Sequence, residues 1–338
     1  MKILYGIQGT GNGHISKAET IYPLLKNYGK VDVLISAANY SLRPSFPVKF
    51  KKKGISFSVS KGKINYWSTL KNIDLVSFLN DMNSVPFKAY DLVVSDFEPI
   101  TAWGAKKHRV KSLQISHQAA FHSIKSPRPF IINPFAELVM RYFAPTNDYI
   151  GLHFKKYSKN ISEPIIKKSI FNIETTINNH ITVYLPWEDD EIILNLFSKI
   201  KNHTFHVFNP NISKDYSVEN VEFKVISNQK FVESLASCYG VICNAGFETP
   251  SEALFLGKRL IVIPLKGQYE QKCNAIALKN MAIPIIKKLN INSLLLINNW
   301  LESKPKKITF NCSLESLLKN KMRQINLNFI NTKDLKSF

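Results

Sequence analysis

The chain has few cysteines and no long apolar run. Its 338 residues include four cysteines, Cys238, Cys243, Cys273 and Cys312, and no two of them have Cys-x-x-Cys spacing. This pattern argues against a zinc site or a disulfide framework and favours a reducing, cytoplasmic setting. No apolar stretch approaches the ~20 residues of a membrane-spanning helix, and the glycine-rich loop follows the amino terminus too closely for a signal peptide. We therefore expect neither a membrane-spanning helix nor a signal peptide.

Acidic residues are scarce relative to basic ones. The chain has 45 Lys and Arg against 25 Asp and Glu, a net charge of +20, and residues 1–165 carry +13 of it. The excess favours an anionic partner, such as a membrane surface or a phospholipid-linked acceptor. Compositional drift is the alternative, because Lys, Asn and Ile are abundant throughout. Neither an arginine-rich nor an aromatic-interleaved nucleic-acid motif occurs, so we expect no nucleic-acid partner.

Length and periodicity predict an α/β fold with two domains. Hydrophobic residues make up 45% of the chain, enough for two cores of ordinary size. Apolar strand segments alternate with helical patterns in both halves, which is typical of parallel sheets. We expect a first domain over residues 1–164, a linker over 165–180, a second domain over 181–312 and a final helical segment over 313–338.

Polar groups follow three predicted strands of the first half. The strand from Lys2 to Ile7 precedes a glycine-rich loop that ends in His14, the next polar pair is Asp96 with Glu98, and His117 follows the third strand. Open α/β sheets place their sites at the carboxyl ends of such strands. A dinucleotide site is disfavoured, because the strand from Val31 to Ile35 ends without an acidic residue.

The stretch from Cys243 to Ala275 predicts a binding unit in the second half. A buried strand ends in a turn around Gly246, and a helix then starts near Glu248 or Thr249, with Pro250 suited to its first position. A glycine turn that opens a helix after a strand is an anion site, because free N–H groups and the positive end of the helix dipole point outward.

This unit resembles the donor-binding half of GT-B nucleotide-sugar glycosyltransferases of families one and twenty-eight. These include the plant-type UDP-glycosyltransferases and the peptidoglycan-precursor N-acetylglucosaminyltransferase. The resemblance implies two Rossmann-like domains that face each other across a cleft, with the last helix crossing back to the first domain. The matching positions are Gly246, Thr249, Glu252, Gly257, Pro264, Glu270 and Gln271.

The resemblance also implies roles for these residues. The turn from Gly246 to Thr249 takes the diphosphate, Glu252 takes the ribose hydroxyls, and the pair Glu270-Gln271 takes the sugar hydroxyls. Two positions depart from the plant-type pattern: Asn244 replaces a phosphate-binding His, and Glu248 replaces an Asn. A second glycine-rich loop of many family members is replaced by Pro186-Trp187-Glu188-Asp189-Asp190.

We therefore expect an inverting, metal-independent glycosyltransferase that uses a nucleotide diphosphate sugar, with a UDP-sugar as the expected donor and no other cofactor. The chain contains no Asp-x-Asp motif for a metal. His14 is the expected catalytic base and Asp96 the residue that orients it. The expected donor-binding residues are Asn244, Gly246, Phe247, Glu248, Thr249, Glu252, Glu270 and Gln271. The expected cleft and acceptor residues are Gly11, Asn12, Gly13, Glu98 and His117.

Two other functions are compatible with the same pattern. One is a UDP-sugar 2-epimerase of the same fold, for which Glu98, Glu188 and Glu248 would supply carboxylates around the sugar. The other is a non-catalytic protein that binds nucleotide sugars.

The segment from Phe121 to Phe154 is aromatic, basic and rich in proline. It predicts either a helix that covers the sheet or an interfacial patch that meets lipid. The second interpretation places the protein in the cytoplasm, peripherally on the inner face of the membrane, where it would act on a lipid-linked acceptor in cell-envelope glycan or glycolipid synthesis.

Overall fold

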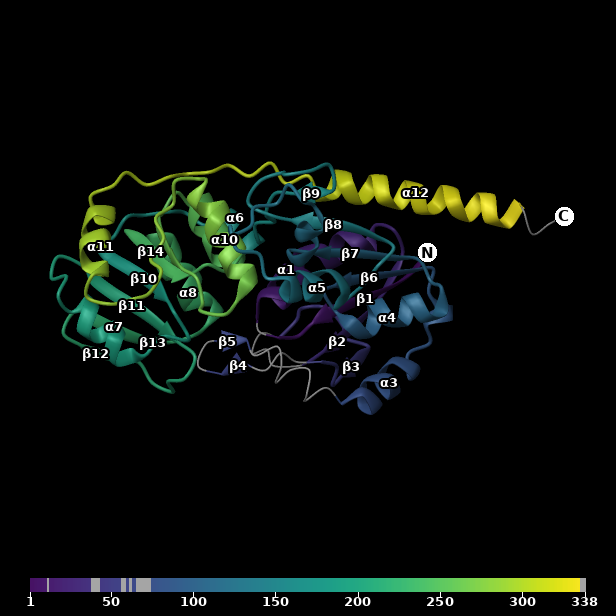
Figure 1. Ribbon diagram of the computed structural model, residues 1–338, viewed down its shortest axis with the longest axis horizontal. Coiled ribbons are helices and arrows are strands. Elements are labelled where there is room, and N and C mark those ends of the chain that lie inside the picture. The colour runs from purple at the N-terminus through teal and green to yellow at the C-terminus, as the bar shows by residue number, and fades with distance from the viewer. Residues whose placement is uncertain (11, 38–42, 56–58, 61–62, 65–73, 335–338) are drawn as a thin grey trace.

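Two α/β units lie side by side in the computed structural model (Figure 1). The structure describes residues 1–10, 12–37, 43–55, 59–60, 63–64 and 74–334. The first unit contains a seven-stranded sheet in the order β3-β2-β1-β6-β7-β8-β9, and the second a six-stranded sheet in the order β12-β13-β11-β10-β14-β15. All pairs in these two sheets are parallel except β12 with β13.

The elements of the first unit are, in chain order, β1 (Lys2–Gln8), α1 (Asn12–Lys26), β2 (Lys30–Ser36), β3 (Phe50–Lys52), β4 (Val59–Ser60), β5 (Lys63–Ile64), α3 (Leu75–Asn83), η1 (Phe87–Ala89), β6 (Leu92–Asp96), α4 (Pro99–His108), β7 (Ser112–Ser116), η2 (Gln118–His122), α5 (Pro134–Tyr142), β8 (Asp148–Leu152) and β9 (Ile161–Ser162). The short pair of β4 and β5 is antiparallel and separate from the large sheet.

The remaining elements are α6 (Lys168–Phe171), β10 (His180–Tyr184), α7 (Asp190–Phe197), β11 (Thr204–Asn209), β12 (Tyr216–Val218), β13 (Val221–Val225), α8 (Asn228–Ser237), β14 (Gly240–Asn244), α9 (Glu248–Phe255), β15 (Arg259–Ile263), α10 (Tyr269–Lys279), α11 (Ser293–Leu301) and α12 (Leu314–Asp334). The predicted linker, residues 165–180, contains α6 and ends at the first residue of β10.

The central strands are buried along nearly their whole length, as parallel strands covered on both faces must be. Every residue of β6, β7 and β14 is buried. One cluster of buried apolar side chains continues from the first unit into the second, and it includes Ile7 of β1 and Val241 of β14. The packing of the two units is therefore part of the core.

Each sheet reverses its strand order at one point. In the first sheet, β1 lies between β2 and β6, and Ile7 is opposite Asp96 in the register. In the second sheet, β10 lies between β11 and β14, and Tyr184 is opposite Cys243. Crossover connections leave from opposite faces of the sheet at such a point, so a crevice opens at the carboxyl ends of the two strands.

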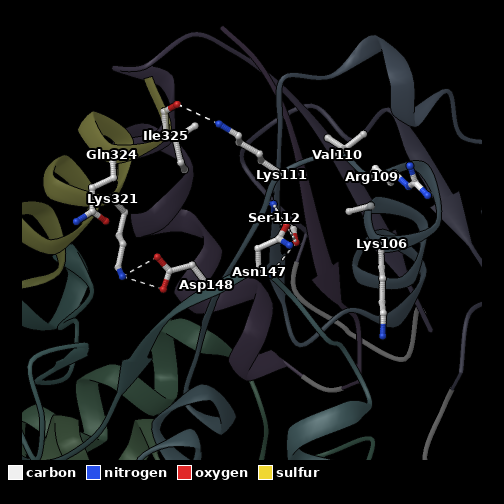
Figure 2. Close-up of a pocket in the computed structure, with 11 residues that line it drawn as sticks. Lys106, Arg109, Val110, Lys111, Ser112, Asn147, Asp148, Lys321, Gln324 and Ile325 are labelled. Carbon is white, nitrogen blue, oxygen red and sulfur yellow. Dashed lines mark hydrogen bonds and ion pairs between the residues drawn. The ribbon is translucent and has the colours of Figure 1, made fainter. Parts of the chain in front are cut away.

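The chain returns to the first unit through α12, which lies along its edge (Figure 1). Leu314, Leu318 and Met322 of this helix are buried in the cluster that contains β1. A cavity of about 510 Å³ lies beside them at the amino ends of β7 and β8. Figure 2 shows Lys321 paired with Asp148 across this cavity, with Nζ 2.6 Å from Oδ2. None of the predicted site residues lines this cavity.

Three sequence predictions of local structure need correction. The apolar segment from Met281 to Ile286 predicts a strand, but its only ladder contact in the described chain is an isolated bridge from Ile285 to Val262. Pro250 is the third residue of α9 and not the first, because the helix begins at Glu248. Helix α1 begins at Asn12, so His14 lies within the first helical turn.

We predict that Leu318→Ala lowers the free energy of unfolding by ~2–5 kcal/mol, because it removes a fully buried side chain from a close-packed core. Urea denaturation of the full chain measures the change. Lys319→Ala, at an exposed neighbouring position of the same helix, is the matched control and should change stability by less than about 0.5 kcal/mol. Equal effects in the two variants would contradict the packing of α12 into the core.

Candidate active site

A cavity of about 590 Å³ lies where the carboxyl ends of the two sheets face each other. It is lined by Gly13, Lys167, Tyr184, Pro186, Trp187, Ile226, Ser227, Asn228, Phe231, Asn244, Gly246, Phe247, Glu248, Thr249, Glu252, Leu265 and Gln271. Seven of the eight residues predicted to bind the donor are among them. The exception is Glu270.

The amino terminus of α9 opens onto this cavity. Phe247 is the N-cap residue and its side chain forms no capping hydrogen bond. In the described chain, no intramolecular hydrogen bond is formed by the backbone N–H groups of residues 246–249. A methyl group placed on Gly246 would have no heavy atom within 4 Å. Free N–H groups, the helix dipole and open space in front of them make this turn suitable for an anion.

Asn244, at the end of β14, presents an acceptor to the cavity. Its Nδ2 donates to the carbonyl of Ile263 at 3.0 Å, whereas its Oδ1 is buried without a hydrogen-bond partner in the described chain. A free amide oxygen is suited to a hydroxyl group, and it would repel a phosphate oxygen. Asn244 therefore differs in chemistry from the phosphate-binding His that the resemblance implies at this position.

Glu252 and Gln271 line the same cavity from α9 and α10. Glu252 is buried, and its Oε1 lies 2.8 Å from Nζ of Lys167. Burial raises the pKa of the Glu252 carboxyl, and the charge of Lys167 reduces this rise. Gln271 accepts a hydrogen bond from Leu265 N at 2.9 Å through its Oε1. Its amide N–H groups remain available to a ligand.

Glu248 is the carboxylate without a cation at this site: it forms no ion pair among the described residues. Burial raises its pKa to about 7. Lys17 and Lys167 oppose the rise, and the negative charges of Glu252 and Asp96 add to it. Its side chain reaches the first unit, because a methyl group on Gly13 would lie 3.7 Å from Glu248 Cγ. Glu248 can therefore change its charge near neutral pH.

Two side chains of α1, His14 and Lys17, share the carboxylate of Asp96. His14 Nδ1 lies 3.0 Å and Lys17 Nζ 2.9 Å from the same oxygen, Oδ1, while Asp96 is fully buried and Lys17 nearly so. Burial alone would raise the pKa of Asp96, but the charges of Lys17 and His14 outweigh it and lower this pKa. Asp96 therefore stays ionised and contacts the His14 ring at Nδ1, which leaves Nε2 at the opposite edge of the ring.

His117 and Glu270 connect the two units. His117 Nδ1 donates to the carbonyl of Leu152 at 2.7 Å, and its Nε2 lies 2.8 Å from Oδ1 of Asn274 on α10. The His117 ring stacks on Phe247 with centroids 4.2 Å apart. Burial lowers the pKa of His117, and the nearby charge of Glu270 opposes this.

Glu270 is bound to the first unit, since its Oε2 accepts a hydrogen bond from Gln118 Nε2 at 3.0 Å. The sequence predicts Glu270 in the donor site and His117 in the cleft. The structure places both at the contact between units, where they hold the turn at Phe247 in position.

Glu98 also differs from its prediction. It is the N-cap of α4, and its carboxylate accepts hydrogen bonds from Ile100 N, Thr101 N and Ser36 Oγ at 2.9, 2.6 and 2.7 Å. Because these bonds satisfy a fully buried carboxylate, Glu98 has no group left for an acceptor. Gly11 lies outside the described residues, and Asn12 is described only through its backbone as the first residue of α1.

Sequence reasoning missed Lys17 and Lys167. A signal for Lys17 was present, because residues three apart on a helix share a face and Lys17 follows His14 by three. No local signal exists for Lys167, whose partner Glu252 is distant in the sequence. Tyr184 and Trp187 of the cavity wall were also not singled out as binding residues.

Two Rossmann-like units with a cavity between the carboxyl ends of their sheets are the GT-B architecture. The chain belongs to glycosyl transferase family 1, whose model matches residues 1–305. Among curated proteins, none matches this chain in sequence.

Solved glycosyltransferases have similar folds. UGT89C1 of Arabidopsis thaliana complexed with UDP has a TM-score of 0.61 and 12% identity, over 89% of this chain and 90% of that one. SnogD of Streptomyces nogalater has a TM-score of 0.53 and 13% identity, over 95% and 99%. MurG of Acinetobacter baumannii has a TM-score of 0.52 and 13% identity, over 89% and 90%. At these identities the likeness establishes the fold.

We predict that Glu248→Gln stabilises the protein at pH 8 and has little effect at pH 5. The pKa of Glu248 rises from 4.5 to about 7 on folding, so ionisation costs folding free energy that is incurred progressively as the pH rises from 4.5 to 7. A neutral Gln avoids this cost, a gain of ~1–3 kcal/mol at pH 8.

Urea denaturation at both pH values measures the difference. Glu174→Gln, at an exposed position, is the control and should show no such pH dependence. A gain from Glu248→Gln that is equal at pH 5 and pH 8 would contradict the raised pKa.

Proposed function

We propose that this glycosyltransferase is an inverting, metal-independent enzyme that moves a sugar from a UDP-sugar to an acceptor hydroxyl. One observation carries the proposal: Gly13, which precedes His14 of the His14–Asp96 pair, lines the cavity from the first unit, and the uncapped amino terminus of α9 opens onto the same cavity from the other unit. These are the two groups that the reaction requires, a base for the acceptor and a positive site for the leaving diphosphate.

In this mechanism His14 Nε2 takes the proton of the acceptor hydroxyl. The acceptor oxygen forms a bond to C1 of the sugar on the face opposite the diphosphate, the bond from C1 to the diphosphate oxygen breaks, and UDP leaves with the bonding electrons. Attack from the opposite face inverts the configuration at C1. Asp96 orients the imidazole through Nδ1 and stabilises the imidazolium that forms.

Lys17 adds a fixed positive charge to this arrangement. Its ammonium group lies on the same Asp96 oxygen as the His14 ring, so Asp96 remains ionised whether His14 is protonated or neutral. Because Lys17 offsets part of the Asp96 charge, it also limits how strongly Asp96 favours the imidazolium. We propose that Lys17 is a positioning residue that holds the Asp96 carboxylate in place beside His14.

The leaving diphosphate would bind at the N–H groups of residues 246–249, where the helix dipole stabilises the charge that develops on it. Absence of an Asp-x-Asp motif supports a mechanism in which this helix terminus takes the place of a metal.

Glu252 is suited to the ribose hydroxyls and Gln271 to the sugar. Trp187, Tyr184 and Phe231 supply aromatic surface around the remaining part of the cavity, where the nucleobase would lie near Ser227 and Asn228.

The acceptor is proposed to be a hydroxyl of a lipid-linked or cell-envelope glycan precursor, with the enzyme peripheral to the inner face of the membrane. The high positive charge of residues 1–165 supports this setting. In the described part of the chain, no helix has the length and apolarity to cross a membrane.

A UDP-sugar 2-epimerase is the alternative activity. It is supported by Glu248, whose carboxyl lies at the cavity and has a pKa of about 7, where it can exchange a proton. Glu98 does not support it, since its carboxylate is used to cap α4. Incubation with a UDP-sugar and no acceptor separates the two: an epimerase produces a new sugar nucleotide, and a transferase leaves the donor unchanged apart from slow hydrolysis.

We predict that His14→Ala lowers kcat by roughly 10²–10⁴, the usual contribution of a general base, while UDP binds as in the wild type. His14 belongs to the unit opposite the donor turn. Steady-state kinetics at saturating substrates and calorimetry with UDP measure the two quantities. Normal turnover of His14→Ala would remove His14 from the mechanism.

We further predict that Glu252→Gln and Gln271→Ala separate the two parts of the donor. Loss of the Glu252 carboxylate should weaken UDP and UDP-sugar alike, roughly 10-fold or more, because charged hydrogen bonds to ribose are lost. Loss of the Gln271 amide should weaken the UDP-sugar and spare UDP. Calorimetry with both ligands tests this, and unchanged affinities in both variants would reject the assignment.

A further inference from the structure

The surface of the first unit displays large apolar side chains to solvent between η2 and α5. Ile124 is 92% exposed, Phe130 fully exposed and Ile131 83% exposed. Exposed side chains of α5 continue the same surface, and we call the whole set the apolar patch. Its members are Ile124, Phe130, Ile131, Ile132, Phe135, Leu138 and Tyr142. Soluble surfaces seldom carry so many large apolar groups together, and such patches mark interaction sites.

The loop that carries the patch is held in place by Arg128. Its guanidinium donates to the carbonyls of Phe121, Ser123 and Ser126, at 2.6, 3.0 and 2.8 Å. The same group forms a two-point pair with Glu137 of α5, at 2.8 and 3.2 Å. Because these bonds fix both ends of the loop to the helix, Phe130 and Ile131 project outward from an ordered support.

The inner face of α5 is already occupied. Ala136 and Met140 pack with Phe121 of the first unit and with Tyr269 and Cys273 of α10. Tyr269 also donates from its hydroxyl to Glu137 at 2.8 Å. The opposite side of α5 carries Leu138 and Tyr142, which are both exposed. Since α10 also carries Gln271 of the cavity, the patch lies close to the sugar end of the proposed donor site.

The polar groups around the patch are those of an interfacial segment. Lys125 and Arg141 are the flanking cations, and the one acidic residue within residues 121–147, Glu137, is turned inward to Arg128. At the carboxyl end of α5, Trp103 donates from its indole to the carbonyl of Phe143 at 3.2 Å, and Lys106 lies 4.9 Å above the Trp103 ring. Exposed apolar groups beside cations and a half-exposed Trp are suited to a lipid headgroup layer.

We propose that the apolar patch inserts into the surface of an anionic membrane, with Phe130 and Ile131 at its tip. The cations Lys125, Arg141 and Lys106 then meet lipid phosphates, and α5 holds the cleft next to the bilayer. This attachment extends the proposed function by naming the surface that would present a lipid-linked acceptor to His14, but it does not rest on the donor assignment. The flanking cations favour an anionic surface over a neutral one, and the nearly full exposure of Phe130 and Ile131 at the tip favours insertion into a lipid layer over docking in a protein groove.

Co-sedimentation of the full chain with vesicles tests the proposal. One set of vesicles is phosphatidylcholine alone, and the other contains phosphatidylglycerol in addition. The wild type should bind the anionic vesicles at low salt and be released by high salt, because surface charges are screened. The double variant Phe130→Ser with Ile131→Ser should bind ~10-fold or more weakly, and Phe135→Glu with Arg141→Glu should weaken binding through both charge and apolar contact.

Leu295→Ser is the matched control, since Leu295 is 71% exposed on α11 of the other unit, and it should leave binding unchanged. Thermal unfolding and UDP binding of all variants should match the wild type, which separates failure of this proposal from failure of the donor site. Absence of binding by the wild type to anionic vesicles would overturn the proposal. So would equal losses in the patch and control variants. A wild-type dimer that Phe130→Ser with Ile131→Ser converts to a monomer, without vesicle binding, would identify a second copy as the occupant and reject the membrane.

Discussion

Buried charge at the contact between the two units constrains the whole site. Three carboxylates meet there, Asp96 from the first sheet and Glu248 and Glu252 from α9. Burial disfavours the charged form of each, so each must either pair with a cation or tend to bind a proton. Lys17 pairs with Asp96 and Lys167 pairs with Glu252. Glu248 forms no ion pair within the part of the chain that the structure describes, and burial raises its pKa to about 7. The two lysines therefore oppose the effect of burial at Asp96 and Glu252 more directly than at Glu248.

The contact between units is specific as well as charged. His117 stacks on Phe247 and reaches Asn274, so a residue that follows β7 fixes the turn that would bind the diphosphate. Gln118 and Glu270 add a second polar link. Glu270 and His117, which the sequence pattern assigns to the donor site and the cleft, here join the two units. The geometry of the donor turn thus depends on the first unit, although its residues belong to the second.

The same first unit carries the proposed base and the apolar patch. Helix α5 is shared by both regions: its inner face packs on α10 beside the cavity, and its outer face is exposed. An enzyme attached through this face would have its cleft near the lipid headgroups, so an acceptor would not need to leave the membrane. Such an arrangement is consistent with the basic character of residues 1–165.

The sequence by itself determined the α/β class, the two-unit organisation and the strand, turn and helix around Gly246. These features follow from local patterns. A buried strand, a glycine turn and a helix start lie next to one another from Gly240 to Phe255, so each can be predicted from its own residues. Polar groups at strand ends likewise indicated His14 and Asp96, because parallel strands bring their carboxyl ends to one edge.

The tertiary structure alone decided the partners of these groups. Lys167 reaches Glu252, and His117 reaches Asn274, across sequence separations that no periodicity encodes. Glu98 has the same residue type and strand-end position as a site carboxylate, yet the start of α4 takes both of its oxygens. Whether a polar side chain is free for chemistry depends on which neighbours satisfy its hydrogen bonds, and packing brings those neighbours from distant parts of the chain.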